Sequence, residues 1–86
     1  MKILITGSAG FIGYHLTKYL LKNTKFKIFG CDSLNSYYSL SLKKNRLKNL
    51  LKFKNFKFFK INLKNSKKIT SLFEKKKFDI VIHLAA

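Results

Sequence analysis

The chain has 86 residues, of which 47% are apolar, and 19 basic against 3 acidic side chains give it a formal net charge of +16. This length permits one domain with a modest core, and the apolar content, with nine Phe and four Tyr, excludes a disordered tail. The sequence has no apolar run of the roughly 18 residues that a membrane span needs. Its start lacks a signal peptide's features, so we expect a cytoplasmic protein.

The charge and the single cysteine suggest no special chemistry. The lysines are scattered along a chain that is rich in Lys, Asn, Ile and Phe and has no Pro, a bias typical of AT-rich coding sequence. A basic nucleic-acid-binding protein stays open as a further alternative, although the composition bias accounts for the charge. Cys31 cannot form an internal disulfide, and His15 and His83 do not stand at a metal-ligand spacing. We predict no metal site and a buried Cys31 near a strand end.

Strand and helix patterns alternate along the whole sequence. Strands are expected where apolar residues run without alternation, and helices where they recur at helical spacing. The expected strands are Lys2–Thr6, Phe26–Asp32, Phe56–Leu63 and Phe78–Leu84. The expected helices are Phe11–Asn23, Leu40–Leu51 and a third that follows Ser66 and ends at about Lys76. Such alternation predicts an α/β fold: a Rossmann-type parallel sheet, built β-α-β-α-β-α-β, with strand order 3-2-1-4.

The pattern also predicts what each helix and the last strand bury. The expected inward-facing residues are Ile12, Leu16, Tyr19 and Leu20 in the first helix, Leu40, Leu47, Leu50 and Leu51 in the second, and Ile69, Leu72 and Phe73 in the third. Ser66 is the expected N-cap of the third helix. The last strand, centred on Ile80–Ile82, has the composition of a strand buried on both faces, yet it falls at a sheet edge.

Three glycines occupy the turn between the first strand and the first helix. Gly7 suits a tight turn, Gly10 a close approach of the backbone to a pyrophosphate, and Gly13 the packing of the helix on the sheet. The N–H groups at the helix start, around Phe11 and Ile12, are expected to bind phosphate oxygens. An ordinary loop is the alternative interpretation.

An acidic residue, Asp32, closes the second expected strand. A carboxylate there can accept hydrogen bonds from both hydroxyls of an adenosine ribose and repels a 2′-phosphate, so the pattern favours NAD over NADP. A turn-forming aspartate is the alternative. Thr6 and Ser8 are expected to make hydrogen bonds in the turn rather than to act as nucleophiles.

These residues carry a family resemblance. Met1–Gly13 resembles the start of the extended short-chain dehydrogenase/reductases, the NAD-dependent epimerase/dehydratase family. Asp32–Tyr38, followed by Leu42-Lys43 and Arg46-Leu47, resembles the UDP-glucuronate 4-epimerase branch, and Phe78–Ala86 resembles the fourth strand with its His-Leu-Ala-Ala signature. The resemblance covers the whole chain but only the N-terminal part of a family member.

The resemblance implies a set of cofactor-binding residues. It assigns the pyrophosphate to Gly7, Gly10, Phe11, Ile12 and Gly13, the adenine ribose to Asp32, the adenosine side to Asn35 and Ser36, and the underside of the cofactor to Leu84, Ala85 and Ala86. Family members usually carry Asp-Leu or Asp-Ile after the third strand, where they read the adenine. This chain has Asn62-Leu63 there, and Asn62 can still offer a hydrogen bond.

The family's chemistry needs a Ser or Thr and a Tyr-x-x-x-Lys pair further along. Tyr14 and Lys18 have that spacing, but on the first helix, beside the phosphate turn, the hydroxyl is out of reach of a nicotinamide, so we predict no catalytic residue in this chain. In a full-length member, NAD would oxidise the sugar C4 transiently. The leading hypothesis is thus the NAD-binding portion of a nucleotide-sugar epimerase or dehydratase.

The resemblance also implies partners. A UDP-sugar is expected only in the full-length protein, full-length members are expected to be homodimers, and we expect no membrane partner. We expect this chain to be a portion of a longer protein, marginally stable and inactive on its own. A non-catalytic NAD-binding or redox-sensing module is the alternative, and the chemistry of these residues leaves epimerase and dehydratase open.

Overall fold

The structure, a computed structural model, describes residues 1–34, 40–62 and 64–84. Its strands are β1 (Lys2–Thr6), β2 (Lys27–Asp32), β3 (Phe56–Lys60) and β4 (Ile80–His83), and its helices are α1 (Phe11–Asn23), α2 (Leu40–Leu50) and α3 (Ser66–Lys76). The strands pair in parallel in the order β3-β2-β1-β4. Both the α/β class and the strand order predicted from the sequence are confirmed.

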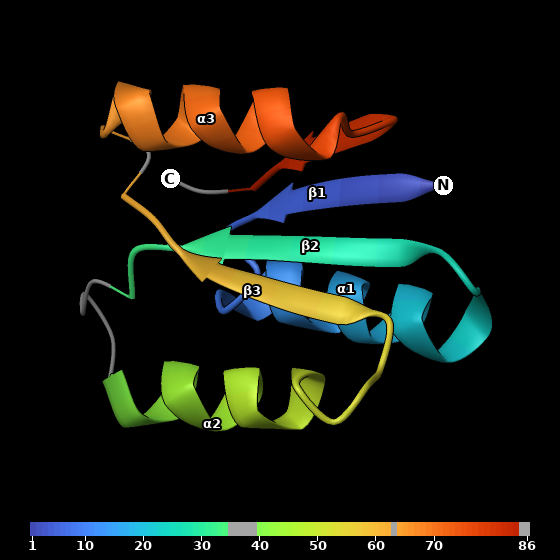
Figure 1. The fold of residues 1–86 in the computed structure, drawn as a ribbon. Coiled ribbons are helices and arrows are strands. Elements are labelled where there is room, and N and C mark those ends of the chain that lie inside the picture. The colour runs from blue at the N-terminus through green and yellow to red at the C-terminus, as the bar shows by residue number, and fades with distance from the viewer. Residues whose placement is uncertain (35–39, 63, 85–86) are drawn as a thin grey trace.

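The sheet is covered on both faces, which explains the unbroken apolar strands. Ile3 and Ile5 of β1 point to the face where α1 and α2 pack, whereas Leu4 between them points to the face of α3. Figure 1 shows these two helical layers on opposite sides of the strands. Leu4 and Ile5 are fully buried. A strand between two helical layers has a nearly continuous apolar run, as β1 has from Ile3 to Ile5.

Helix α1 buries the predicted stripe only in part: Leu16 and Leu20 pack against the core, whereas Ile12 and Tyr19 do not. Ile12 and Tyr19 are 67% and 63% exposed, and the buried side chains include Tyr14 and Thr17. The physical reason is the glycine turn. Gly13 lies against the backbone of the turn, and this contact turns Gly13, Tyr14 and Thr17 inward in place of Ile12. Helical spacing alone predicts which face of α1 is apolar. The contact between Gly13 and the turn shifted the buried face away from Ile12 and Tyr19.

The other two helices follow the pattern only in part. Leu50 of α2 and Leu72 of α3 are buried, whereas Leu40, Leu51 and Phe73 are exposed. The predicted residues Leu47 and Ile69 are partly buried and pack against the core.

The predicted N-cap of α3 was wrong by one residue. Asn65 is the cap, with its side chain accepting a hydrogen bond from the N–H of Lys68 at 3.2 Å, and Ser66 is the first helical residue. Asn and Ser are comparable caps, so sequence alone could not choose between neighbours.

Several strands are shorter than expected. In β3 the ladder ends because the Asn62 side chain accepts a hydrogen bond from the N–H of Lys64 at 3.0 Å and turns the chain. Before β4, Lys77 adopts a left-handed conformation with φ 48° and closes α3. Phe78 then packs edge-on against Phe29 instead of extending the strand.

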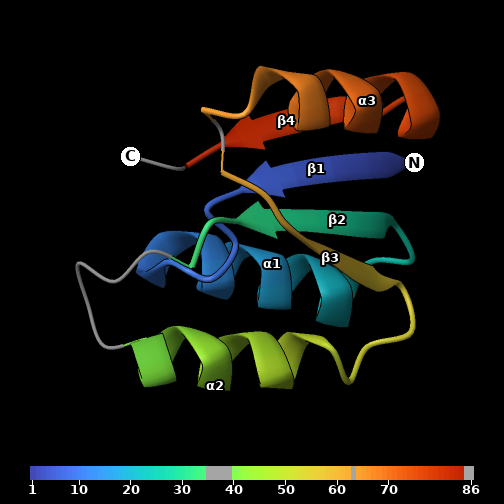
Figure 2. The same cartoon turned by 60° about the vertical axis from the view of Figure 1, so that its left-hand side comes forward.

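The last strand, β4, lies at the edge of the sheet beside β1, as Figure 2 shows. Ile80 and Val81 are 41% and 44% exposed. Within the described residues β4 therefore exposes apolar side chains that its composition suits to burial. None of the helices formed by these residues is long and apolar enough to cross a membrane.

Candidate functional site

The glycine turn is tied directly to the end of β2. Gly7 has φ 73°, a conformation that L side chains rarely adopt, and its N–H donates to the carbonyl of Cys31 at 2.8 Å. The N–H of Gly10 donates back to the Gly7 carbonyl at 3.0 Å. These bonds turn the chain sharply from β1 into α1 and hold the turn above the carboxyl ends of β1 and β2.

The first helix begins unusually close to this turn. A Cβ at Gly13 would overlap the Gly7 carbonyl oxygen and lie 2.8 Å from its carbon, so any side chain there would push helix and turn apart. A Cβ at Gly10 would lie 3.2 Å from the same oxygen. Gly13 therefore allows a close approach of the helix to the turn, whereas the sequence predicted a close approach to the sheet.

The N-terminus of α1 presents N–H groups at the carboxyl edge of the sheet. Gly10 is the N-cap and supplies no side chain to cap the helix. Among the described residues, the N–H groups of Phe11 and Ile12 have no hydrogen-bond partner. Such N–H groups, together with the helix dipole, favour an anionic oxygen, so the geometry suits the predicted phosphate contact.

Asp32 lies beside the turn and is 7% exposed. Its Oδ2 accepts from the N–H of Ala9 at 3.2 Å, and its Oδ1 accepts from the N–H of Leu34 at 2.8 Å. The carboxylate is therefore held by backbone from both the glycine turn and its own loop. This arrangement brings the predicted ribose-binding acid next to the predicted phosphate turn.

Two basic residues of α2 join this arrangement, and the predicted site did not include them. Lys43 Nζ lies 3.4 Å from Asp32 Oδ1, and Arg46 Nη1 donates to the Ala9 carbonyl at 3.2 Å. The sequence held one signal, since both residues belong to the stretch that carries the resemblance. Their contacts depend on how α2 packs, which local patterns do not give.

Ser8 packs beneath the turn. Its side chain is fully buried, and its hydroxyl has no hydrogen-bond partner among the described residues. A Cβ at Gly30 of β2 would lie 2.5 Å from that hydroxyl oxygen. The turn therefore fits closely over β2, and Gly30 provides the room.

The opposite side of the turn is formed by the ends of β1 and β4. The N–H of Leu84 donates to the Thr6 hydroxyl at 3.0 Å, and the same oxygen lies 2.7 Å from His83 Nδ1. Leu84 is 38% exposed at this edge, so its side chain is accessible there. Thr6 thus makes hydrogen bonds here, as expected.

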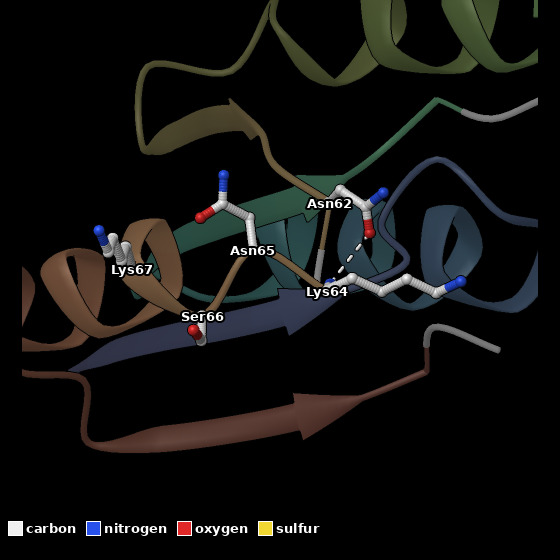
Figure 3. A pocket seen from close by; sticks show the side chains of 5 residues that line it. All are labelled: Asn62, Lys64, Asn65, Ser66 and Lys67. Atoms are coloured by element: carbon white, nitrogen blue, oxygen red, sulfur yellow. Dashed lines mark hydrogen bonds between the residues drawn. The ribbon is translucent and has the colours of Figure 1, made fainter.

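A shallow, open hollow of about 510 Å³ lies where β3 leads into α3. Figure 3 shows its lining, which comprises Asn62, Lys64, Asn65, Ser66 and Lys67. The N–H of Ile61 donates to the Asp32 carbonyl at 3.2 Å, so Asn62 directly follows a residue that is hydrogen-bonded to Asp32. Its position at this edge suits the predicted adenine contact.

The remaining predicted residues, Asn35, Ser36, Leu63, Ala85 and Ala86, lie outside the described residues. Of the predicted set, the fold therefore brings Gly7, Gly10, Phe11, Ile12, Gly13, Asp32, Asn62 and Leu84 to one edge of the sheet.

Tyr14 and Cys31 have structural surroundings. Tyr14 is buried between α1 and α2, where its hydroxyl accepts from Asn49 Nδ2 at 3.4 Å, and Lys18 lies over its ring. Cys31 is fully buried, as predicted. Burial, assisted by the charge of Asp32, raises the pKa of its thiol to about 11, so the thiol stays protonated.

Comparison with known proteins gives relatives along the whole chain. The chain is 45% identical to the UDP-glucuronate 4-epimerase of Thermodesulfobacterium geofontis, with 96% of this chain and 25% of that protein aligned. It is 51% identical to the dTDP-D-glucose 4,6-dehydratase of Dictyostelium discoideum, with 99% of this chain and 19% of that protein aligned. The chain thus spans a quarter or less of the length of these relatives.

A solved structure has the same fold. The crystal structure of UDP-glucuronic acid 4-epimerase from Bacillus cereus, in complex with UDP-glucuronic acid and NAD, superposes with a TM-score of 0.88 at 37% identity, and the match covers 100% of this chain and 26% of that one. The sequence profile described as GDP-mannose 4,6 dehydratase matches residues 4–86. The chain belongs to this family of nucleotide-sugar dehydratases and epimerases.

Proposed function

We propose that residues 1–86 are the N-terminal portion of a Rossmann domain that binds NAD in a nucleotide-sugar epimerase or dehydratase. One observation carries the proposal: the Ala9 N–H of the glycine turn donates to Asp32. This bond sets a phosphate-binding turn and a ribose-binding acid side by side at the carboxyl edge of the sheet, which is where dinucleotides bind in this kind of fold.

In this proposal each group of residues contacts a different part of the cofactor. The turn from Gly7 to Gly13, with the exposed N–H groups at the start of α1, would hold the pyrophosphate. Asp32 would accept from the ribose hydroxyls, and Asn62 would meet the adenine in the hollow of Figure 3. Leu84 would lie beneath the cofactor on the other side of the turn. In this proposal Asn35, Ser36, Leu63, Ala85 and Ala86 complete the contacts.

Bound NAD supplies a reversible hydride acceptor for the sugar carbon. We propose that this chain contributes binding and orientation, and that the acid and base come from elsewhere in a family-length protein. The surroundings of Tyr14 support this, since its hydroxyl is engaged with Asn49 between two helices.

For the substrate we propose a UDP-sugar acid, as in a UDP-glucuronate 4-epimerase. The relatives with that name and the solved epimerase with bound UDP-glucuronic acid support this choice. A dTDP-sugar dehydratase is the second candidate, supported by the Dictyostelium relative. The cytoplasmic location and the homodimer of a full-length protein stay predictions.

Isothermal titration tests the proposal on the chain itself. We expect one NAD per chain, with an affinity that changes little between low and high salt, because a dinucleotide carries few charges. A DNA oligomer serves as the comparison, since an affinity that comes from +16 net charge falls steeply with salt. Salt-steep DNA binding without NAD binding would contradict the proposal and favour the basic nucleic-acid-binding alternative.

Activity separates the enzyme portion from a stand-alone sensor. We expect the chain to bind NAD but to turn over no UDP-glucuronate, and to gain turnover when joined to the remaining part of a relative such as the Thermodesulfobacterium epimerase. A chimera that folds, binds NAD and stays inactive would favour the non-catalytic NAD-binding or redox-sensing module.

A further inference from the structure

Asp32 is 7% exposed and forms an ion pair with Lys43. The ammonium of Lys43 lies 3.4 Å from Asp32 Oδ1, and the two side chains are only 13% and 5% exposed. Charged side chains are rarely this buried unless they are paired. A ribose that reaches Asp32 must therefore meet Lys43 as well.

The position of Lys43 is fixed by the packing of α2. Three residues further along the helix, Arg46 donates to the Ala9 carbonyl at 3.2 Å and places its guanidinium 5.8 Å from the centre of the Phe11 ring. Since the N–H of Ala9 bonds Asp32, the same short segment of the turn contacts both the acid and α2. Lys43 is thereby held over the carboxylate by the fold.

The two charges respond in opposite ways to the 2′ position of a ribose. Free 2′ and 3′ hydroxyls can donate to the Asp32 carboxylate while their oxygens accept from the Lys43 ammonium. A 2′-phosphate is repelled by Asp32 but attracted by Lys43. The pair therefore contains both a group that rejects NADP and a group that would bind it.

We propose, given the NAD site proposed above, that Lys43 is a specificity-determining residue of this chain. Lys43 attracts a 2′-phosphate and so offsets part of the repulsion by Asp32. The negative charge of Asp32 is then the feature that keeps the site selective for NAD. Removing that charge should uncover a cationic site for NADP built on α2.

The experiment measures NAD and NADP affinities of the 86-residue chain and of variants built on Asp32→Asn. Asn keeps an acceptor for the Ala9 N–H while removing the charge. The variants are D32N, D32N/K43M and D32N/K44M. Lys44 is the matched control, because it loses the same charge from the same helix, is exposed, and makes no interaction among the described residues.

We expect D32N to raise the NADP affinity relative to NAD at least tenfold. Adding K43M should then lower the NADP affinity about tenfold, the usual effect of losing a hydrogen bond between charged groups, whereas K44M should leave it within about twofold. Circular dichroism checks that each variant folds, and D32S replaces D32N if that variant does not.

The outcomes separate the two proposals. In one outcome, the wild-type chain binds NAD while K43M and K44M, each added to D32N, lower the NADP affinity equally. In that case the net charge of the chain explains the NADP affinity. The role of Lys43 is then overturned, but the NAD site stands. If D32N gains no NADP affinity, the role of Lys43 is overturned as well. If the folded wild-type chain binds neither dinucleotide, the proposed function fails and this inference fails with it.

Discussion

At the residue scale, the site depends on close backbone approach more than on side-chain chemistry. Gly13 lies against the Gly7 carbonyl, and Gly30 gives room to the Ser8 side chain beneath the turn. The glycine spacing predicted that Gly13 allows close packing, but of the helix on the sheet rather than on the turn. The sequence could not predict the second contact, since Gly30 looks like any small residue in a strand until β2 is placed under the turn.

Gly30→Ala should destabilise the chain by about 1–3 kcal/mol, the usual cost of an overpacked core. The new Cβ would lie 2.5 Å from the Ser8 hydroxyl and 2.8 Å from the Ser8 Cβ. Urea unfolding followed by circular dichroism measures the change. Unaltered stability of G30A would mean that the turn does not pack on β2 as described.

Ser8→Ala is the companion variant. The buried Ser8 hydroxyl has no partner among the described residues, so its removal should leave stability unchanged or raise it by up to about 1 kcal/mol. The same urea titration serves for both variants. A clear loss of stability in S8A would show that the hydroxyl makes a stabilising hydrogen bond.

The thiol of Cys31 should react slowly with iodoacetamide. With a pKa raised from 9.0 to about 11, its thiolate fraction at pH 8 is about a hundredfold below that of an ordinary cysteine. The chain unfolded in urea is the control and should react at the normal rate. Equal rates in both states would contradict the burial of Cys31.

The same shift predicts a pH dependence of folding. The unfolded chain loses the thiol proton near pH 9 and the folded chain near pH 11. The contribution of this thiol to the free energy of unfolding is therefore fully present below pH 9 and is lost as the pH rises toward 11. Urea unfolding of wild type and of Cys31→Ala at pH 8 and 10.5 measures it. The loss between these pH values should be larger for wild type than for C31A, and equal losses would contradict it.

At the element scale, the alternation of strands and helices was predictable, but the details of the helices were not. Apolar runs between helical patterns specify the parallel sheet and its order. The stripe on α1 was wrong at Ile12 and Tyr19, because Gly13 rather than a large apolar residue sets the rotation of the helix. The contacts of Lys43 and Arg46 likewise depend on the packing of α2, so the sequence could not place them in the site.

The start of α3 offers a direct test at this scale. Asn65→Ala should cost about 1 kcal/mol of stability, since it removes the acceptor for the Lys68 N–H, whereas Ser66→Ala, one residue on, should cost much less. Thermal unfolding of the two variants makes the comparison. A larger loss in S66A would restore Ser66 as the cap.

At the scale of the whole molecule, two features remain outside the site: the net charge of +16 and the apolar edge at β4. Repulsion between highly charged chains favours the monomer, and an exposed apolar edge favours association. The binding site lies at the carboxyl ends of the strands, apart from the side chains of Ile80 and Val81 on that edge.

Val81→Lys should weaken self-association of the chain at least tenfold, as measured by sedimentation equilibrium, because a charged side chain on an edge strand opposes pairing. Leu51→Lys is the matched control. Leu51 is 55% exposed at the end of α2, so a lysine there adds the same charge away from the β4 edge. If both variants weaken association equally, charge rather than the β4 edge controls it.

The central claim is that the glycine turn and Asp32 together bind NAD, and an NMR titration of the ¹⁵N-labelled chain tests it most directly. With NAD, the account predicts that amide shifts concentrate in residues 7–13, at Asp32 and around Asn62 and Leu84, and that the same amides respond to ADP-ribose. Shifts spread over the lysine-rich outer faces of α2 and α3, or no shifts in a folded chain, would contradict it.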